Sequence, residues 1–137
     1  MSFNTKAVIL WALKLLAAAI MLQTLFFKFT AAPESVYIFS TLGMEPWGRI
    51  GTGVMELLAS ALILIPTTSG VGALLGIGLM GGAIFFHLTK LGLVVQDDGG
   101  QLFIYALLVF ISCVVLAFVY RKDLFQLVGI STLLKKE

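Results

Sequence analysis

The residues best placed to do chemistry are a few polar side chains that interrupt a strongly apolar chain, and Glu56 is the most informative of them. On a helix, Arg49, Glu56 and Ser60 fall on one face, together with Thr52 and Gly53. A carboxylate within an apolar segment either takes up a proton or finds a cation. We therefore expect Glu56 to have a positively charged partner or to act as a protonatable group.

Other apolar segments carry polar groups that can approach Glu56. His87 lies on a stripe of small residues, which predicts that its side chain points into the protein. Gln101 and Tyr105 share a face of the last apolar segment, and Lys28 lies near the end of the first. The candidate ligand-binding or polar-core site, centred on the outer half of the protein, comprises Glu56, His87, Lys28, Arg49, Tyr105, Gln101 and Ser60.

Two interpretations of this set remain open. In the structural one, Lys28, Arg49 or His87 satisfies Glu56, and the buried polar network fixes the register of the helices. In the functional one, the polar residues line a pocket for a quinone, a lipid or another small amphiphile, which has a polar head and an apolar body.

Several kinds of chemistry find no support in the sequence. His87 is the only histidine and Cys113 the only cysteine, which excludes an intrachain disulfide and predicts no metal site. No hydrolase, metalloprotease or phosphate-loop motif is present, so we predict no catalytic residues in this chain. The net charge of +2 comes with no long basic run, which argues against a nucleic-acid partner.

Membrane-spanning helices must position these polar groups. Apolar residues make up 60% of the chain and charged residues 12%, against about 45–50% and about 25% in soluble proteins. A spanning helix needs about 20 mainly apolar residues. This composition therefore predicts an all-α fold, namely an integral membrane four-helix bundle in the lipid bilayer. The bundle is expected to form one transmembrane domain over residues 1–137. The expected spans are residues 7–29, 47–65, 71–91 and 101–120.

The connecting segments complete the predicted topology. Residues 34–44 predict a short element on the membrane surface, and residues 121–137 an interfacial tail with a short helix. Lys and Arg gather on the side that holds both termini, so the positive-inside rule places the termini in the cytoplasm. We expect a multi-pass protein of the cell inner membrane. Lys14 is expected to extend toward the cytoplasmic surface, and Gln23 to face lipid or a partner.

The third apolar segment contains two GxxxG pairs, Gly72–Gly76 and Gly78–Gly82. Small residues at this spacing let two helices approach closely in a membrane. We favour packing within this bundle for both pairs, with a homo-oligomer face as the alternative.

Short motifs along the chain resemble the DoxX and DoxX-like family of small membrane proteins. They cover roughly residues 14–120. The motifs are Phe27-Lys28-Phe29, Phe39 with Leu42-Gly43 and Pro46, Gly53-Val54-Met55-Glu56-Leu57-Leu58 with Ser60, the run 62–65, and Phe86-His87-Leu88 after a glycine-rich segment.

This resemblance implies a four-helix membrane bundle whose family-like polar residues are Lys28, Glu56 and His87. It also implies a link to membrane redox chemistry, as a subunit associated with thiosulfate:quinone oxidoreduction or with other oxidoreductase complexes. Related eukaryotic proteins assist the assembly or trafficking of membrane clients. If the chain takes part in an enzyme, we expect it to be an oxidoreductase subunit.

Three functions follow as hypotheses. The first is a non-catalytic or partner-dependent component of membrane redox chemistry that binds a quinone or another amphiphile near Glu56 and His87. The second is an assembly or scaffold subunit for an oxidoreductase or another membrane protein, with a purely structural polar cluster. The third is a small proton-coupled transporter, which four helices without an inverted repeat make the weakest.

Overall fold

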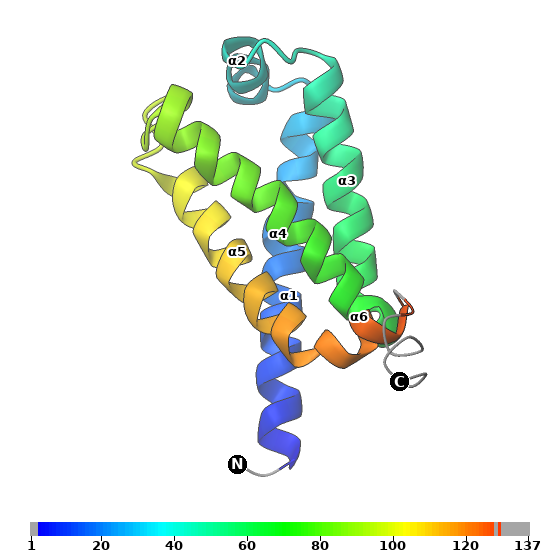
Figure 1. Cartoon of the computed structure of the whole chain (residues 1–137). Helices are drawn as coiled ribbons and strands as arrows, with labels where there is room; N and C mark the ends of the chain where they lie inside the picture. The colour runs from blue at the N-terminus through cyan, green and yellow to red at the C-terminus, as the bar shows by residue number, and fades with distance from the viewer. Residues whose placement is uncertain (1–2, 128, 130–137) are drawn as a thin grey trace.

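The computed structural model describes residues 3–127 and residue 129, and this part of the chain contains helices and no strands. Four helices are long and apolar enough to cross a membrane, which confirms the predicted all-α membrane fold. The long helices are α1 (Phe3–Phe29), α3 (Trp47–Leu64), α4 (Ser69–Phe86) and α5 (Gln101–Val119), and the short ones are α2 (Pro33–Thr41) and α6 (Arg121–Leu127). Figure 1 shows their arrangement.

Proline and glycine mark the places where the helices begin and end. Pro33 is the first residue of α2, Pro46 directly precedes α3, and the 3-10 turn Pro66–Thr68 leads into α4. At its far end α4 continues as one π-helical turn, His87–Leu91. That turn ends at Gly92, whose φ of +81° is a backbone conformation that glycine adopts without a steric penalty.

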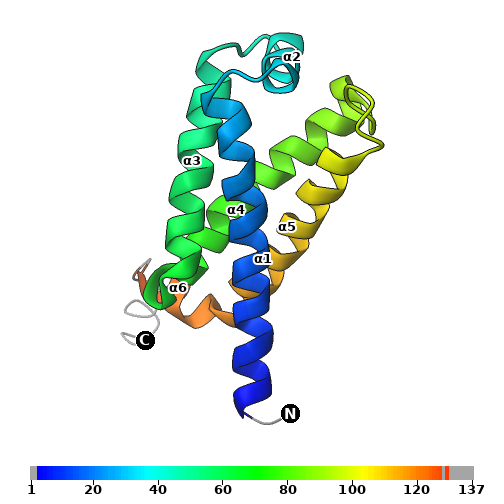
Figure 2. The same cartoon turned by 180° about the vertical axis from the view of Figure 1, so that it is seen from behind.

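The four long helices form a ring in which α1 and α4 each pack on α3 and on α5. The terminal end of the bundle holds the start of α1, the turn Pro66–Thr68 and α6, whereas the loop end holds α2 and residues 92–100 (Figure 1). Figure 2 shows the same bundle from behind. In both views the first turns of α1 extend past the ends of the other long helices. The cytoplasmic position of the terminal end remains a prediction.

Alanines form a large part of the interior of the bundle, between larger side chains such as Met21, Ile63 and Leu116. Large apolar side chains such as Phe26, Ile111 and Phe118 face outward, as expected for a lipid-facing surface. Where these alanines lie, the helix backbones can come close together, which is how helices associate where no water drives them inward. The buried core consists of Ala17, Met21, Ala59, Ile63, Ala73, Met80, Ala106, Val109, Cys113 and Leu116.

The two predicted surface elements differ in how much of them the structure describes. Helix α2 occupies the segment between the first two spans, with Ser35 and Phe39 buried. Of the expected C-terminal tail, the structure describes α6 and Gly129. Residues 128 and 130–137 lie outside the described residues.

Asp98 organises the segment that enters α5. Its Oδ1 accepts hydrogen bonds from the backbone N–H groups of Val95 (3.0 Å) and Gly100 (2.8 Å), and its Oδ2 accepts one from Leu102 (3.2 Å). Partial burial raises the pKa of Asp98, but these three N–H groups outweigh it, with a smaller contribution from His87 when its ring is protonated, and hold the pKa below 3.8. The ionised carboxylate therefore fixes both the loop and the start of α5.

We expect the Asp98→Asn variant to unfold at a lower temperature than the wild type at neutral pH, because it loses a charged acceptor. A carboxyl group whose pKa falls on folding stabilises the folded state above its unfolded pKa, and this contribution disappears as the pH drops through the folded value. The difference in Tm should therefore close below pH 3.8. Thermal unfolding in detergent, with Asp97→Asn as the exposed neighbouring control, measures it, and a pH-independent difference would contradict the assignment.

Candidate functional site

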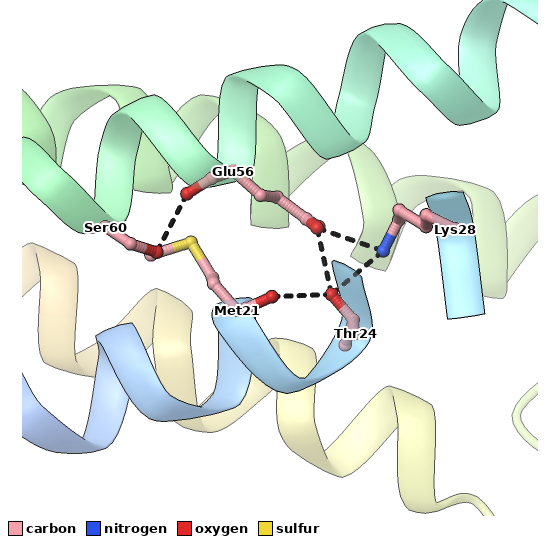
Figure 3. Close-up of polar contacts among 5 residues, drawn as sticks. All are labelled: Met21, Thr24, Lys28, Glu56 and Ser60. Atoms are coloured by element: carbon pink, nitrogen blue, oxygen red, sulfur yellow. Dashed lines mark hydrogen bonds and ion pairs between the residues drawn. The ribbon is translucent and has the colours of Figure 1, made fainter. Parts of the chain in front are cut away.

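A buried ion pair joins the first two membrane-spanning helices. Lys28 Nζ on α1 lies 3.0 Å from Glu56 Oε2 on α3, and the side chains are 13% and 5% exposed. Figure 3 shows the two residues reaching toward each other across the contact between α1 and α3. Of the three cations predicted as partners for Glu56, Lys28 is the one that forms the ion pair.

Thr24 sits within the same contact and touches both charged groups. Its Oγ1 lies 2.9 Å from Glu56 Oε2, 3.1 Å from Lys28 Nζ, which donates to it, and 2.8 Å from the Met21 carbonyl oxygen (Figure 3). A hydroxyl group has one proton, so it can donate to only one of its two acceptors at a time. With Glu56 ionised, Thr24 donates to the carboxylate. With Glu56 protonated, Glu56 can donate to Thr24, which then turns its proton to Met21.

Ser60 belongs to the neighbourhood of Glu56 but not to its carboxylate. Its Oγ donates to the backbone carbonyl oxygen of Glu56 at 2.8 Å, one helical turn earlier (Figure 3). A serine within a helix commonly satisfies its hydroxyl in this way. The hydrogen bond keeps Ser60 satisfied in the core without contributing to the charge balance of the ion pair.

Arg49 forms a second ionic contact next to the first. Its guanidinium binds Glu45, with Nε 2.9 and 3.0 Å from the two carboxylate oxygens and Nη2 2.9 Å from Oε1. Its Nη1 also donates to the backbone carbonyl oxygen of Lys28. The carbonyl groups in the last turn of a helix have no partner within the helix and carry partial negative charge, so a guanidinium suits them. Arg49 thus closes the end of α1 while Lys28 pairs with Glu56.

His87 belongs to a different group, at the loop end of α4 and α5. Its Nδ1 lies 2.9 Å from the Gly92 carbonyl oxygen, and its ring packs edge-to-face on Phe103, with the centroids 5.6 Å apart. Because a carbonyl oxygen only accepts hydrogen bonds, Nδ1 carries the proton and Nε2 of the neutral ring is the acceptor. Gln101 and Tyr105 form a further pair on α5, with Gln101 Nε2 2.7 Å from Tyr105 Oη.

The structure therefore brings together Lys28, Glu56 and, through a backbone contact, Arg49. Thr24 and Glu45 complete this group, although the sequence analysis passed over both. Their spacing was the available signal, because Thr24 precedes Lys28 and Glu45 precedes Arg49 by four residues, which places each pair on one helix face. A functional role for these residues remains a prediction.

Cavities and metal ligands complete the description of the site. Two described cavities lie at the terminal end of the bundle, lined by Thr67, Asp123, Gln126 and Leu127 and by Lys6, Ala7, Leu10, Trp11 and Tyr120. Neither is lined by Glu56 or His87. Within residues 3–127 and 129, no three His, Cys, Asp or Glu side chains are grouped closely enough to hold a metal ion.

We expect Lys28→Met to destabilise the protein strongly, since it leaves the buried Glu56 carboxylate without its cation. The double variant Lys28→Met, Glu56→Gln should recover part of that loss, with a coupling free energy of about 1–3 kcal/mol. Unfolding in detergent measures the double-mutant cycle. Lys90→Met, which removes an exposed lysine at the same end, is the matched control. Purely additive effects would show that the ion pair does not couple α1 to α3.

Comparison with known proteins agrees with the motifs found in the sequence. The model of the DoxX-like family matches residues 12–119, a stretch that includes Thr24, Lys28, Arg49, Glu56 and His87. No curated protein and no solved structure matches the chain. The family match covers most of the chain, including α3, α4, α5 and the last two thirds of α1. The chain is therefore a membrane protein that belongs to the DoxX-like family.

Proposed function

We propose that this protein is a non-catalytic, partner-dependent component of the cell inner membrane that assembles with another membrane protein through the outward face of α4. The observation that supports this most directly is a contrast between the inside and the outside of the bundle. Glu56 finds its cation and Arg49 its carboxylate within the chain, whereas a pair of glycines on α4 is open to the surroundings.

The two GxxxG pairs of α4 have different surroundings. A Cβ atom at Gly72 would lie 2.6 Å from the Ile63 backbone nitrogen, and one at Gly76 would lie 2.5 Å from Cys113 Sγ. These two glycines therefore allow α3 and α5 to pack against α4. A Cβ atom at Gly78 or Gly82 would meet no described atom within 4 Å. The second pair leaves a flat strip of backbone that a helix of another protein can approach closely.

Gln23 on α1 offers a second polar contact to a partner. Its side chain is exposed, next in sequence to Thr24 and thus at the level of the Glu56 ion pair. The described residues provide no hydrogen-bond partner for its amide group. An amide surrounded by lipid has an unfavourable free energy unless it finds a donor or an acceptor, and a glutamine of this kind stabilises contacts between membrane helices. In this proposal the Lys28–Glu56 pair holds the fold that presents both surfaces.

We expect Gly78→Leu and Gly82→Leu to abolish co-purification of a stoichiometric partner from native membranes while leaving the Tm of the isolated protein nearly unchanged. Gly51→Leu is the matched control, because Gly51 is exposed on α3 and its Cβ would also meet nothing within 4 Å. Quantitative mass spectrometry of the purified complex measures the stoichiometry. Retention of the partner in the Gly78 and Gly82 variants, or equal loss in the Gly51 variant, would contradict the proposal.

A second candidate function is the binding of a quinone or another small amphiphile near His87 and Glu56, in the half of the bundle predicted to be outer. The supporting observation is the π-helical turn that begins at His87. Such turns are rare and frequently occur at functional sites. Nδ1 of His87 is held by Gly92, which orients Nε2 as a hydrogen-bond acceptor for a hydroxyl group. An oxidoreductase partner would then supply the redox chemistry.

For this candidate we expect quinone extracted from the purified protein to fall sharply in His87→Ala, with a smaller loss in Glu56→Gln. Thr89→Ala is the control, since Thr89 lies on the same π-helical turn, is exposed and bonds only its own helix backbone. Liquid chromatography of the extract quantifies the quinone per protein. A wild-type protein without quinone, or variants in which only the Tm falls, would count against this binding site.

A further inference from the structure

Lys14 is a buried cation far from the Glu56 ion pair. It lies on the part of α1 that faces the end of α5, and its side chain is 2% exposed rather than extended to the surface as the sequence suggested. Its Nζ lies 4.6 Å from the centroid of the Trp11 ring and 4.8 Å from that of Tyr120. The two rings hold the ammonium group by cation–π contacts, which stabilise a cation but leave its net charge in place.

No carboxylate neutralises this charge in the described part of the chain. The ion pairs found there join Lys28 to Glu56 and Arg49 to Glu45. A lysine buried in a membrane protein normally has an anionic partner or marks a binding site. Lys14 therefore differs from Lys28 and Arg49, which have their carboxylates close by.

A cavity adjoins the same aromatic side chains. It has a volume of about 250 Å³ and is lined by Lys6, Ala7, Leu10, Trp11 and Tyr120. Both rings that hold Lys14 thus also form the wall of the cavity, and Lys6 adds a second positive charge to it. Ala7, Leu10 and Lys14 follow one another at helical spacing along α1, which brings Lys14 behind the cavity wall.

The surroundings of the cavity are basic. On the described helices at this end of the bundle, Lys6, Lys14, Arg121 and Lys122 outnumber the single acidic residue, Asp123. Tryptophan and tyrosine next to lysine are typical of the level where a bilayer meets water, and the lipid phosphates lie at that level. Basic pockets between membrane helices bind the head groups of anionic lipids.

We propose that this cavity binds the phosphate of an anionic phospholipid head group, with Lys6 contacting the phosphate and the buried Lys14 supplying the balancing charge from behind Trp11 and Tyr120. A volume of 250 Å³ lies below the range of cavities that enclose a whole drug-sized ligand, and it suits a head group whose acyl chains remain in the bilayer. The bound lipid would then fix the level at which α1 leaves the membrane. This site is independent of the α4 surface and of His87.

Trp11 reports directly on the site, because the chain has only two tryptophans and Trp47 is exposed at the opposite end of the bundle. The experiment uses the full chain with Trp47→Phe in mixed micelles, titrated with brominated phosphatidylglycerol or brominated phosphatidylcholine. We expect the anionic lipid to quench Trp11 fluorescence at a lower mole fraction, by about fivefold for each lysine. Equal quenching by the two lipids would overturn the proposal.

Variants distinguish a loss of lipid binding at this site from a loss of the folded structure. Lys6→Gln removes an exposed charge and should weaken the preference for the anionic lipid without changing the Tm. Lys14→Gln should weaken the preference by a further factor of about five, and Lys14→Arg should retain it. Lys90→Gln, at the loop end, is the matched control and should behave as the parent protein. A preference that keeps its full size in both Lys6→Gln and Lys14→Gln would disprove the assignment.

Inorganic phosphate distinguishes a lipid from a free anion. If the site recognises the phosphate within a lipid, millimolar inorganic phosphate should leave the quenching by brominated phosphatidylglycerol unchanged at constant ionic strength. Displacement of the brominated lipid by inorganic phosphate, but not by chloride at the same ionic strength, would overturn the lipid assignment. It would identify a site for soluble phosphate compounds.

Discussion

The fold depends on a constraint that a membrane imposes on the buried carboxylate of Glu56, which is that the charge needs a cation within the protein. Lys28 and Glu56 meet this constraint with an ion pair between α1 and α3, and Thr24 bonds to both charged groups. The backbone of Lys28 takes part as well, because its carbonyl oxygen receives Arg49. One turn of α1 is thus tied to α3 at two levels, by a side chain and by a helix end.

Helix contact in lipid gains little from the removal of apolar surface from water, so close packing and polar contacts must supply the stability. Short core residues such as Ala17, Ala59 and Ala73 provide the close packing, and Gly72 and Gly76 extend it along α4. The polar contact between α1 and α3 then selects one register among the many that such smooth surfaces permit. Packing and charge therefore have separate tasks: the first brings the helices together and the second aligns them.

The two ends of the bundle have different chemistry. At the loop end, Asp98 binds three backbone N–H groups, and the π-helical turn places His87 against Gly92 and Phe103. At the terminal end, the cations outnumber the carboxylates and lie among aromatic rings. The loop end is thus internally satisfied through backbone groups, whereas the described part of the terminal end has more positive than negative side chains.

The sequence by itself determined the four membrane-spanning helices, because about 20 consecutive apolar residues have no stable arrangement in lipid other than a helix. It also singled out Glu56, Lys28 and His87, since ionisable groups are rare in such segments. It left open which cation pairs with Glu56. Only the crossing of α1 and α3 decided that, because it places Lys28 at Glu56, whereas Arg49 pairs with Glu45, four residues away on the chain.

The tertiary structure also separated residues that the helical pattern had placed together. His87 lies where α4 passes from α-helical to π-helical geometry. A rotation of about 100° per residue therefore no longer predicts which side chains share a face with His87. Gly72 and Gly78 share the same motif, but one faces Ile63 and the other faces open space. A periodic pattern shows which residues share a helix face, and the packing of helices distant in sequence determines what that face meets.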